Sequence, residues 1–439
     1  MQRWLCLWLV VAVALVSCAR GPTPTVAPQI LPTETPATKP TPAVQAVQIT
    51  LWEQEDESGR TSVLYPLIDE FMKENPYIRV VAQSYRTEEL RSQFLTAAQE
   101  QAVPDVVRGP NDLVGVFGAT GALLPLEEMF DPQDLEAFFP GVLAGATLAG
   151  TLYGLPDRCG GHLMLVYNKK LLPTPPVTTD ALIAMAQAAT DAAAGIWGLA
   201  YNTREPFWLA PWLMGFGGAV LDPADDRPRL DSPAMVNALQ FLYDLSATHQ
   251  VVPSGCDYEM ARSLFATGKA AMVIDGDWSL SGYVQAGIDV GTAPLPQVTQ
   301  TGLWPAPLVE GRYFMVSRQL APGSPEFEAV RDFVTFMTSE STQQVWLEKL
   351  KKLPSNKAVA QSPMIQQDPL LAGAAAQLQY ARGRPASPLL GCFWDSVYGN
   401  QQAVLAGTLT PQDAARTMQE SAEQCVQYML QAPPMESKQ

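Results

Sequence analysis

The sequence predicts an α/β protein built from two lobes joined by several short crossings, and three observations support this. Apolar runs of the strand type alternate with helical patterns along the chain. The chain has 439 residues, which is more than one hydrophobic core usually contains. Beyond residue 46 we find neither an internal repeat nor a low-complexity linker. Several short crossings between two lobes are therefore expected, rather than two domains in tandem.

The segment that opens the folded body alternates strands and helices. Five elements are expected in order: a strand over residues 47–52, a helix over 64–72, a strand over 78–82, a helix over 87–98 and a strand over 104–107. This order predicts a mostly parallel sheet with helices on its faces. Ligands of such sheets bind outside the carboxyl ends of the strands. Residues 52–56 and 111–112 follow predicted strands directly, so they should share one rim.

The same alternation returns after Tyr153. Strands are expected over residues 163–167 and 270–274, and an alanine-rich helix over 180–194. These elements predict a second sheet with its own helices.

Composition narrows the classes of function. Lys and Arg number 28 against 44 Asp and Glu, and the net charge of −16 argues against nucleic acid as a partner. The two histidines, His162 and His249, cannot alone form a multi-histidine metal site, and we expect no metal and no cofactor. The 10 Trp residues exceed what packing requires. These aromatic side chains are the feature to follow.

The N-terminal residues have the pattern of a secretion signal. Arg3 precedes an apolar run over residues 5–16, which is too short for a membrane span of about 20 residues. The run ends in the letters LVSC, which resemble the bacterial lipobox, so residues 1–17 are expected to be removed and Cys18 lipidated. An ordinary signal peptide cut nearby is the alternative. Residues 18–46 are rich in Pro and Thr and predict an extended stalk. The protein should therefore be extracytoplasmic and anchored to a bacterial membrane by lipid.

Four cysteines remain in the folded body, and an oxidising compartment allows two disulfides with three pairings. Cys392 and Cys425 lie almost equally far from a turn near residues 407–411, so an antiparallel hairpin would place them side by side. This favours Cys392 with Cys425 and, by elimination, Cys159 with Cys256. Free buried thiols are the alternative.

Four segments carry a family resemblance. They are YGLP at residues 153–156, LVYNKKLLP at 165–173, LFATGKAAMVIDGDW at 264–278 and AGTLTPQDA at 406–414. Together they resemble the extracytoplasmic solute-binding proteins of ABC importers, in particular the maltose-binding-protein-like group of sugar-binding lipoproteins.

The resemblance implies a two-lobed periplasmic-binding-protein fold with a three-segment hinge and a ligand cleft between the lobes. The first lobe would comprise residues 47–157 plus 296–364, and the second 158–295 plus 365–439. A monomer that captures a carbohydrate by hinge closure and delivers it to the permease subunits of the importer is the implied function.

A sugar site needs flat aromatic side chains for the C–H faces of the ring and carboxylates or amides for its hydroxyls. By resemblance, Trp278, Trp394 and one of Phe207 or Trp208 lie at stacking positions. Trp304, in a proline-rich loop near the second crossing, is a further candidate. For each of them, ordinary packing in a core or on a lobe surface is the alternative.

The polar candidates belong to three loops. By resemblance, Asp112 lies at a sugar-binding carboxylate position, and Asn111 beside it is a candidate that can instead cap its own backbone. The loop after the first strand offers Trp52 and Asp56, although its acidic residues can equally be a solvated surface. Asp277 either bonds a sugar or fixes the turn before Trp278.

The chain departs from the maltose binder over residues 157–162. Small residues replace a family carboxylate there, with Arg158 and His162 alongside, which weakens maltose as the ligand. An acidic sugar or a sugar phosphate would suit these two side chains, although a lone histidine is more often structural.

The expected function is thus non-enzymatic sugar binding for import. A polyamine, a peptide or another polar solute is the alternative ligand. A secreted glycoside hydrolase is disfavoured because the acidic residues are spread over both predicted lobes.

Overall fold

The computed structural model describes residues 46–431. The predicted signal peptide, Cys18 and most of the stalk lie outside the described residues. Among the described helices, none is both long and apolar enough to cross a lipid bilayer.

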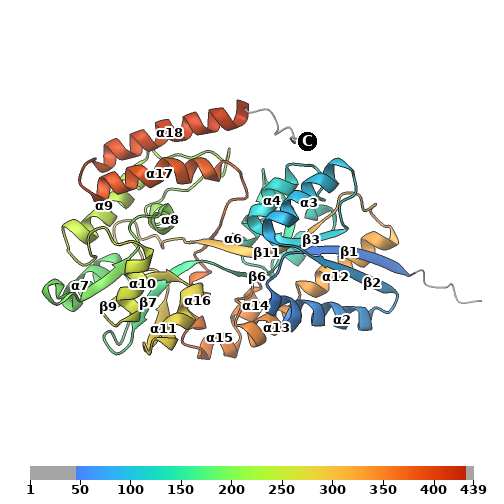
Figure 1. Cartoon of the computed structure of the whole chain (residues 1–439), viewed down its shortest axis with the longest axis horizontal. Helices are drawn as coiled ribbons and strands as arrows, with labels where there is room; N and C mark the ends of the chain where they lie inside the picture. The colour runs from blue at the N-terminus through green and yellow to red at the C-terminus, as the bar shows by residue number, and fades with distance from the viewer. Residues whose placement is uncertain (1–45, 432–439) are drawn as a thin grey trace, which may run out of the picture. The chain divides into compact units, whose positions relative to one another are not determined.

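The first sheet has six strands and is mixed (Figure 1). Its strands are β1 (Val47–Glu53), β2 (Ile78–Ser84), β3 (Val106–Pro110), β6 (Gly154–Gly160), β11 (Leu308–Val316) and β12 (Arg382–Gly383). The first three pair in parallel, as the strand and helix alternation predicts. The pairing of β11 with β12 is also parallel, whereas β11 runs antiparallel to both β3 and β6, so three of the five pairings in this sheet are parallel, as predicted.

The second sheet has four strands in the order β10-β7-β9-β8. They are β7 (Leu163–Asn168), β8 (Trp197–Tyr201), β9 (Ala270–Gly276) and β10 (Val290–Ala293). Every residue of β9 is buried, which fits its continuous apolar run in the sequence. A separate small hairpin joins β4 (Thr147–Leu148) to β5 (Thr151–Leu152).

Amphipathic helices cover the first sheet and bury one face against it. In α2, Leu67, Ile68 and Phe71 are buried, as their spacing predicts, and each contributes about 1.5–3 kcal/mol by leaving water. The helices of this part are α1 (Glu57–Gly59), η1 (Arg60–Leu64), α2 (Tyr65–Glu74), α3 (Thr87–Gln99), α4 (Asn111–Gly118), η2 (Leu126–Glu128), α5 (Pro132–Leu135), α6 (Pro140–Ala144), α12 (Pro325–Met337), α13 (Glu340–Leu350) and α14 (Lys357–Ala360).

The remaining helices accompany the second sheet. They are α7 (Thr179–Ala189), η3 (Ala192–Ala194), α8 (Pro206–Gly215), α9 (Pro233–Ala247), α10 (Tyr258–Ala266), η4 (Asp277–Ser279), α11 (Leu280–Gln285), α15 (Pro363–Gln367), α16 (Leu371–Gln377), α17 (Leu390–Leu405) and α18 (Pro411–Gln431). The alanine-rich helix ends at Ala189 rather than Ala194, because Thr190 takes extended backbone and Asp191 caps a separate short helix.

The chain passes between the two sheets several times. Gly161 and His162 join β6 to β7, and Gly161 takes a positive φ of 66°. Residues 294–307 join β10 to β11. After α16, which packs on β10 and β7, the chain returns to pair β12 with β11 before α17 begins.

One predicted disulfide is present and the other is not. Cys392 and Cys425 are bonded across α17 and α18, which run side by side as the predicted hairpin (Figure 1). The predicted Cys159–Cys256 bond is wrong, since both thiols are free and buried. Cys159 lies in β6 with its thiol against the carbonyl of Pro354, whereas the Cys256 carbonyl accepts the Thr203 amide beside the second sheet.

Candidate functional site

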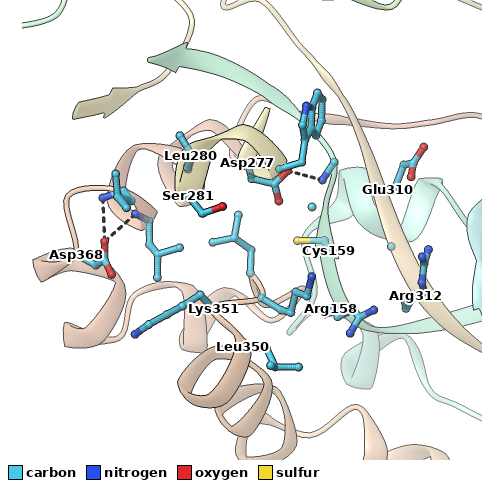
Figure 2. Close-up of a pocket in the computed structure, with 18 residues that line it drawn as sticks. Arg158, Cys159, Asp277, Leu280, Ser281, Glu310, Arg312, Leu350, Lys351 and Asp368 are labelled. Atoms are coloured by element: carbon cyan, nitrogen blue, oxygen red, sulfur yellow. Dashed lines mark hydrogen bonds between the residues drawn. The ribbon is translucent and has the colours of Figure 1, made fainter. Parts of the chain in front are cut away.

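A cavity of about 510 Å³ lies where β6 and β11, which we call the crossing strands, approach the helices that follow β9 of the second sheet. Residues of β6 and β11 form one side, η4 and α11 another, and residues 350–353 and 368–371 the rest. We call it the hinge cavity (Figure 2).

Four aromatic side chains gather beside this cavity. Trp278, which lines it, has its ring centroid 6.4 Å from that of Phe207 and 6.5 Å from that of Trp208. Tyr258 packs against Trp208 at 5.5 Å and accepts a 3.0 Å hydrogen bond from the Trp278 indole nitrogen. Trp278 remains 45% exposed, although its neighbour Trp208 is buried. A large aromatic face is thus held rigidly and still accessible.

The end of β9 explains why Trp278 takes this position. A Cβ on Gly276 would lie only 2.1 Å from the indole ring, so glycine is required for the ring to fold back over the strand end. The Ser279 hydroxyl donates to the Gly276 carbonyl at 2.8 Å and fixes the turn.

Asp277 links the second sheet to the first crossing. Its carboxylate accepts a hydrogen bond from the Gly161 amide at 3.0 Å (Figure 2). A Cβ on Gly160 would lie 2.7 Å from the same carboxylate, so the two glycines allow this close approach. Asp277 therefore lines the cavity and also fixes the geometry of the crossing.

Asn111 and Asp112 begin α4 on the other sheet. Asn111 is buried and donates to the Arg384 carbonyl at 3.0 Å. The Arg384 side chain forms an ion pair with Glu310, which lines the hinge cavity. Asp112 is partly exposed and lies 3.5 Å from Arg91. Asn111 is thus connected to the cavity wall through Arg384, and it does not line the cavity itself.

The other predicted site residues lie elsewhere. Trp52 packs edge-on against Tyr85, and the Asp56 carboxylate caps α1 by accepting the Gly59 amide at 2.8 Å. Trp394 packs on its neighbour Phe393 in α17.

Trp304 belongs to a second, larger cavity of about 1020 Å³. It stacks on Tyr380 there, with ring centroids 4.5 Å apart. The structure thus brings together Phe207, Trp208, Asp277 and Trp278, and it places Trp52, Asp56, Trp304 and Trp394 away from the lining of the hinge cavity.

Arg158, which lines the cavity, belongs to a buried ion network. Arg108 is fully buried and bonds Glu55 at 2.9 Å and Asp157 at 2.7 Å, and Arg158 bonds the same Glu55 oxygen at 2.7 Å. The indole of Trp346 lies under both guanidinium groups, 5.3 Å from that of Arg108 and 4.3 Å from that of Arg158. Glu55 is thus a structural group and not an exposed acid of the predicted loop.

The pKa values in this network follow from burial and charge. Burial raises the pKa of Glu55, but the charges of Arg108 and Arg158 outweigh it and lower the pKa to about 2. For Asp157, burial dominates and raises the pKa above its usual value.

Arg312 and Glu310 were missed as site residues by sequence reasoning. Both line the cavity from β11, where two charged residues two positions apart interrupt an otherwise apolar run. That interruption was the available signal, because alternate residues of a strand share one face. Tyr258 carried no comparable signal, and only the packing of α10 against β9 brings it near Trp278.

The two-lobed α/β fold, with an accessible aromatic face beside β6 and β11, is similar to that of solved maltose- and maltodextrin-binding proteins. The family described as bacterial extracellular solute-binding protein matches residues 66–373. This chain belongs to that family, and its relatives are binding proteins rather than enzymes.

Individual relatives resemble most of the chain. A maltotriose-binding protein of Pyrococcus abyssi is 27% identical over 364 residues, covering 82% of this chain and 77% of the relative. A maltooligosaccharide ABC transporter solute-binding lipoprotein of Streptococcus pneumoniae is 24% identical, covering 68% of this chain and 70% of the relative. The maltose/maltodextrin-binding domain of Bdellovibrio bacteriovorus, solved with maltotriose, is 37% identical with a TM-score of 0.63, covering 87% of this chain and all of that domain.

Proposed function

We propose that this protein is the substrate-binding component of an ABC importer and that it holds a mono- or oligosaccharide between its two lobes. The observation that carries the proposal is the accessible face of Trp278, held by Phe207, Trp208 and Tyr258 at the edge of the hinge cavity. Such a face covers the C–H side of a sugar ring, and Asp277 is within reach of its hydroxyls. Malto-oligosaccharides are the first sugars to test, because the relatives named above bind them.

The lobes are proposed to comprise residues 47–157 plus 296–364 and residues 158–295 plus 365–439. The strands β1, β2, β3 and β11 support the first set, and β7 to β10 support the second. Hinge closure around the ligand would present the loaded form to the permease. Closure would bring Asn111 and Asp112 toward the aromatic face. Contact with the ligand remains a prediction for Trp52, Asp56, Trp304 and Trp394.

We also propose that the protein is a monomer without enzymatic activity, tethered to the membrane through lipid on Cys18. The lipobox-like letters LVSC and the Pro- and Thr-rich segment behind them support this. The pneumococcal relative is itself named a lipoprotein. Metabolic labelling with a fatty acid tests the anchor: Cys18→Ala should abolish incorporation and release the protein from the membrane fraction.

Isothermal titration calorimetry of the full chain against maltose, maltotriose and maltotetraose tests the ligand class. We expect saturable heat with at least one sugar. Trp278→Ala should weaken that binding about 10- to 100-fold, because a central aromatic contact is worth about 1.4–2.8 kcal/mol.

Trp197→Ala is the matched control, since this partly buried tryptophan lies at the start of β8 and lines none of the cavities described above. It should leave the sugar affinity unchanged. Absence of heat with every sugar, together with binding of a polyamine or peptide, would refute the carbohydrate assignment.

A further inference from the structure

The two crossing strands place like charges opposite one another in the hinge cavity. Arg158 of β6 and Arg312 of β11 are partners in the strand register, and both line the cavity. Figure 2 shows the two side chains on the same side of the cavity, with Lys351 at the end of α13 also on its wall. Like charges at directly opposed positions of two strands destabilise the pair unless an anion lies nearby.

The carboxylates of the cavity are already engaged. Glu310 pairs with Arg384, and Asp277 accepts the Gly161 amide. Asp368 accepts the Leu370 amide at 2.9 Å. None of these three forms an ion pair with Arg158 or Arg312 among the described residues.

The guanidinium groups, in contrast, are incompletely satisfied. Glu55 is shared between Arg108 and Arg158. The buried Nη1 nitrogen of Arg158 has no hydrogen-bond partner within residues 46–431. Arg158 is only 6% exposed. The Arg312 side chain forms no ion pair or hydrogen bond to another described residue, and its buried Nε atom is without a partner. Burial and the charges of Arg158 and Arg108 lower the pKa of Arg312.

The wall beside these groups has room for a ligand. Gly160 and Gly161 carry no side chain, and a Cβ on Gly161 would first meet Glu310, at 3.6 Å. The cavity of about 510 Å³ opens between the arginines and the aromatic face of Trp278.

We propose that the hinge cavity binds the anionic group of an acidic saccharide, with Arg312 and Arg158 as its cationic partners and Trp278 beneath the sugar ring. The planar, forked guanidinium matches the geometry of a carboxylate or a phosphate, and both anions share this recognition. This inference rests on the proposed function, because it names the class of sugar that the same site prefers.

Calorimetry with three disaccharides tests it: maltose, its carboxylate counterpart maltobionate, and maltose 6′-phosphate. We expect at least one of the charged sugars to bind about tenfold or more tightly than maltose at low salt, since one partly buried ion pair is worth about a factor of ten. The preference should shrink as salt is raised. Preferential binding of maltobionate alone identifies a carboxylate-bearing sugar as the ligand class, and preferential binding of the phosphate alone identifies a phosphorylated sugar.

The ratio of charged to neutral affinity is the readout for variants. Arg312→Gln should lower that ratio about tenfold, and Arg312→Lys should retain part of it. Arg331→Gln, at an exposed arginine paired with Glu328 outside the cavity, should leave the ratio unchanged. Melting curves check that each variant is folded.

Two negative results are distinguishable. If maltose binds and neither charged sugar binds more tightly, the anion assignment is wrong and the proposed function stands. If no saccharide binds at all, the proposed function itself fails. Equal ratios in the native protein and in Arg312→Gln would also overturn the role of this arginine.

Discussion

Arg108 shows how a single buried charge is made tolerable. Its guanidinium lies over the ring of Phe314 at 5.6 Å and over that of Trp346 at 5.3 Å, and its nitrogens bond Glu55 and Asp157. Removing one member of such a network leaves the others buried without partners, which costs more than the network contributes as a whole.

Arg108→Met is therefore expected to lower the free energy of unfolding by about 3–5 kcal/mol. Urea denaturation followed by circular dichroism measures this. Arg331→Met, at the exposed pair with Glu328, should change it by no more than about 0.5 kcal/mol. Similar losses in the two variants would contradict the structural role of Arg108.

Because of Glu55, the free energy of unfolding should depend on pH. Its pKa is lowered from 4.5 to about 2, so its ionised form stabilises the fold above pH 4.5, and this contribution is lost as the pH falls toward 2. Glu55→Gln should be less stable than the native protein at pH 6, and the difference should shrink by on the order of 3 kcal/mol on going to pH 2. The pKa of Asp157 is raised, so its contribution to the pH dependence of stability has the opposite sign. Asp157 is present in both proteins, so the comparison between them isolates Glu55.

Denaturation midpoints at several pH values between 6 and 2 provide the measurement. A gap between native protein and Glu55→Gln that is constant with pH would show that the carboxylate is not held ionised by its arginines.

Among the elements, the hairpin of α17 and α18 is held covalently. The Cys392–Cys425 bond closes a loop with a sequence separation of 33 residues. Replacing both cysteines by serine should cost about 3–4 kcal/mol through the greater freedom of the unfolded chain. Thermal unfolding of native and variant proteins, each with and without reductant, checks this, and only the native protein should respond to reductant.

Local patterns predicted the elements of the first sheet well. The run that forms β1 and the spacing of Leu67, Ile68 and Phe71 in α2 are readable because each buries one face or a whole strand. The Cys392–Cys425 pairing was accessible for the same reason, since a short turn fixes which residues of a hairpin meet.

Contacts between segments that are distant in the sequence could not be predicted from local patterns. The pairing of Arg158 with Arg312, and of Asp277 with the Gly161 amide, joins residues more than 100 positions apart. Nothing local in the sequence sets the register of β6 against β11. The free thiols illustrate the same limit, because elimination paired Cys159 with Cys256 without knowing that they pack beside different sheets.

At the scale of the whole molecule, ligand binding should change compactness. We expect the radius of gyration from small-angle X-ray scattering to fall when a bound sugar closes the lobes. Trp278→Ala at the same sugar concentration should remain at the unliganded value, because too little of it is loaded. An unchanged radius in a calorimetrically saturated native sample would argue against closure.

The two sheets differ in how much of the chain they need before all their strands are present. The second sheet draws all four strands from residues 163–293, whereas the first begins with β1 and needs β11 and β12 to be complete. A chain exported from its N-terminus can therefore finish the second sheet while the first still exposes an unpaired edge at β3. We therefore expect the part of the protein that is exported first to become native last and to need protection from aggregation for longest.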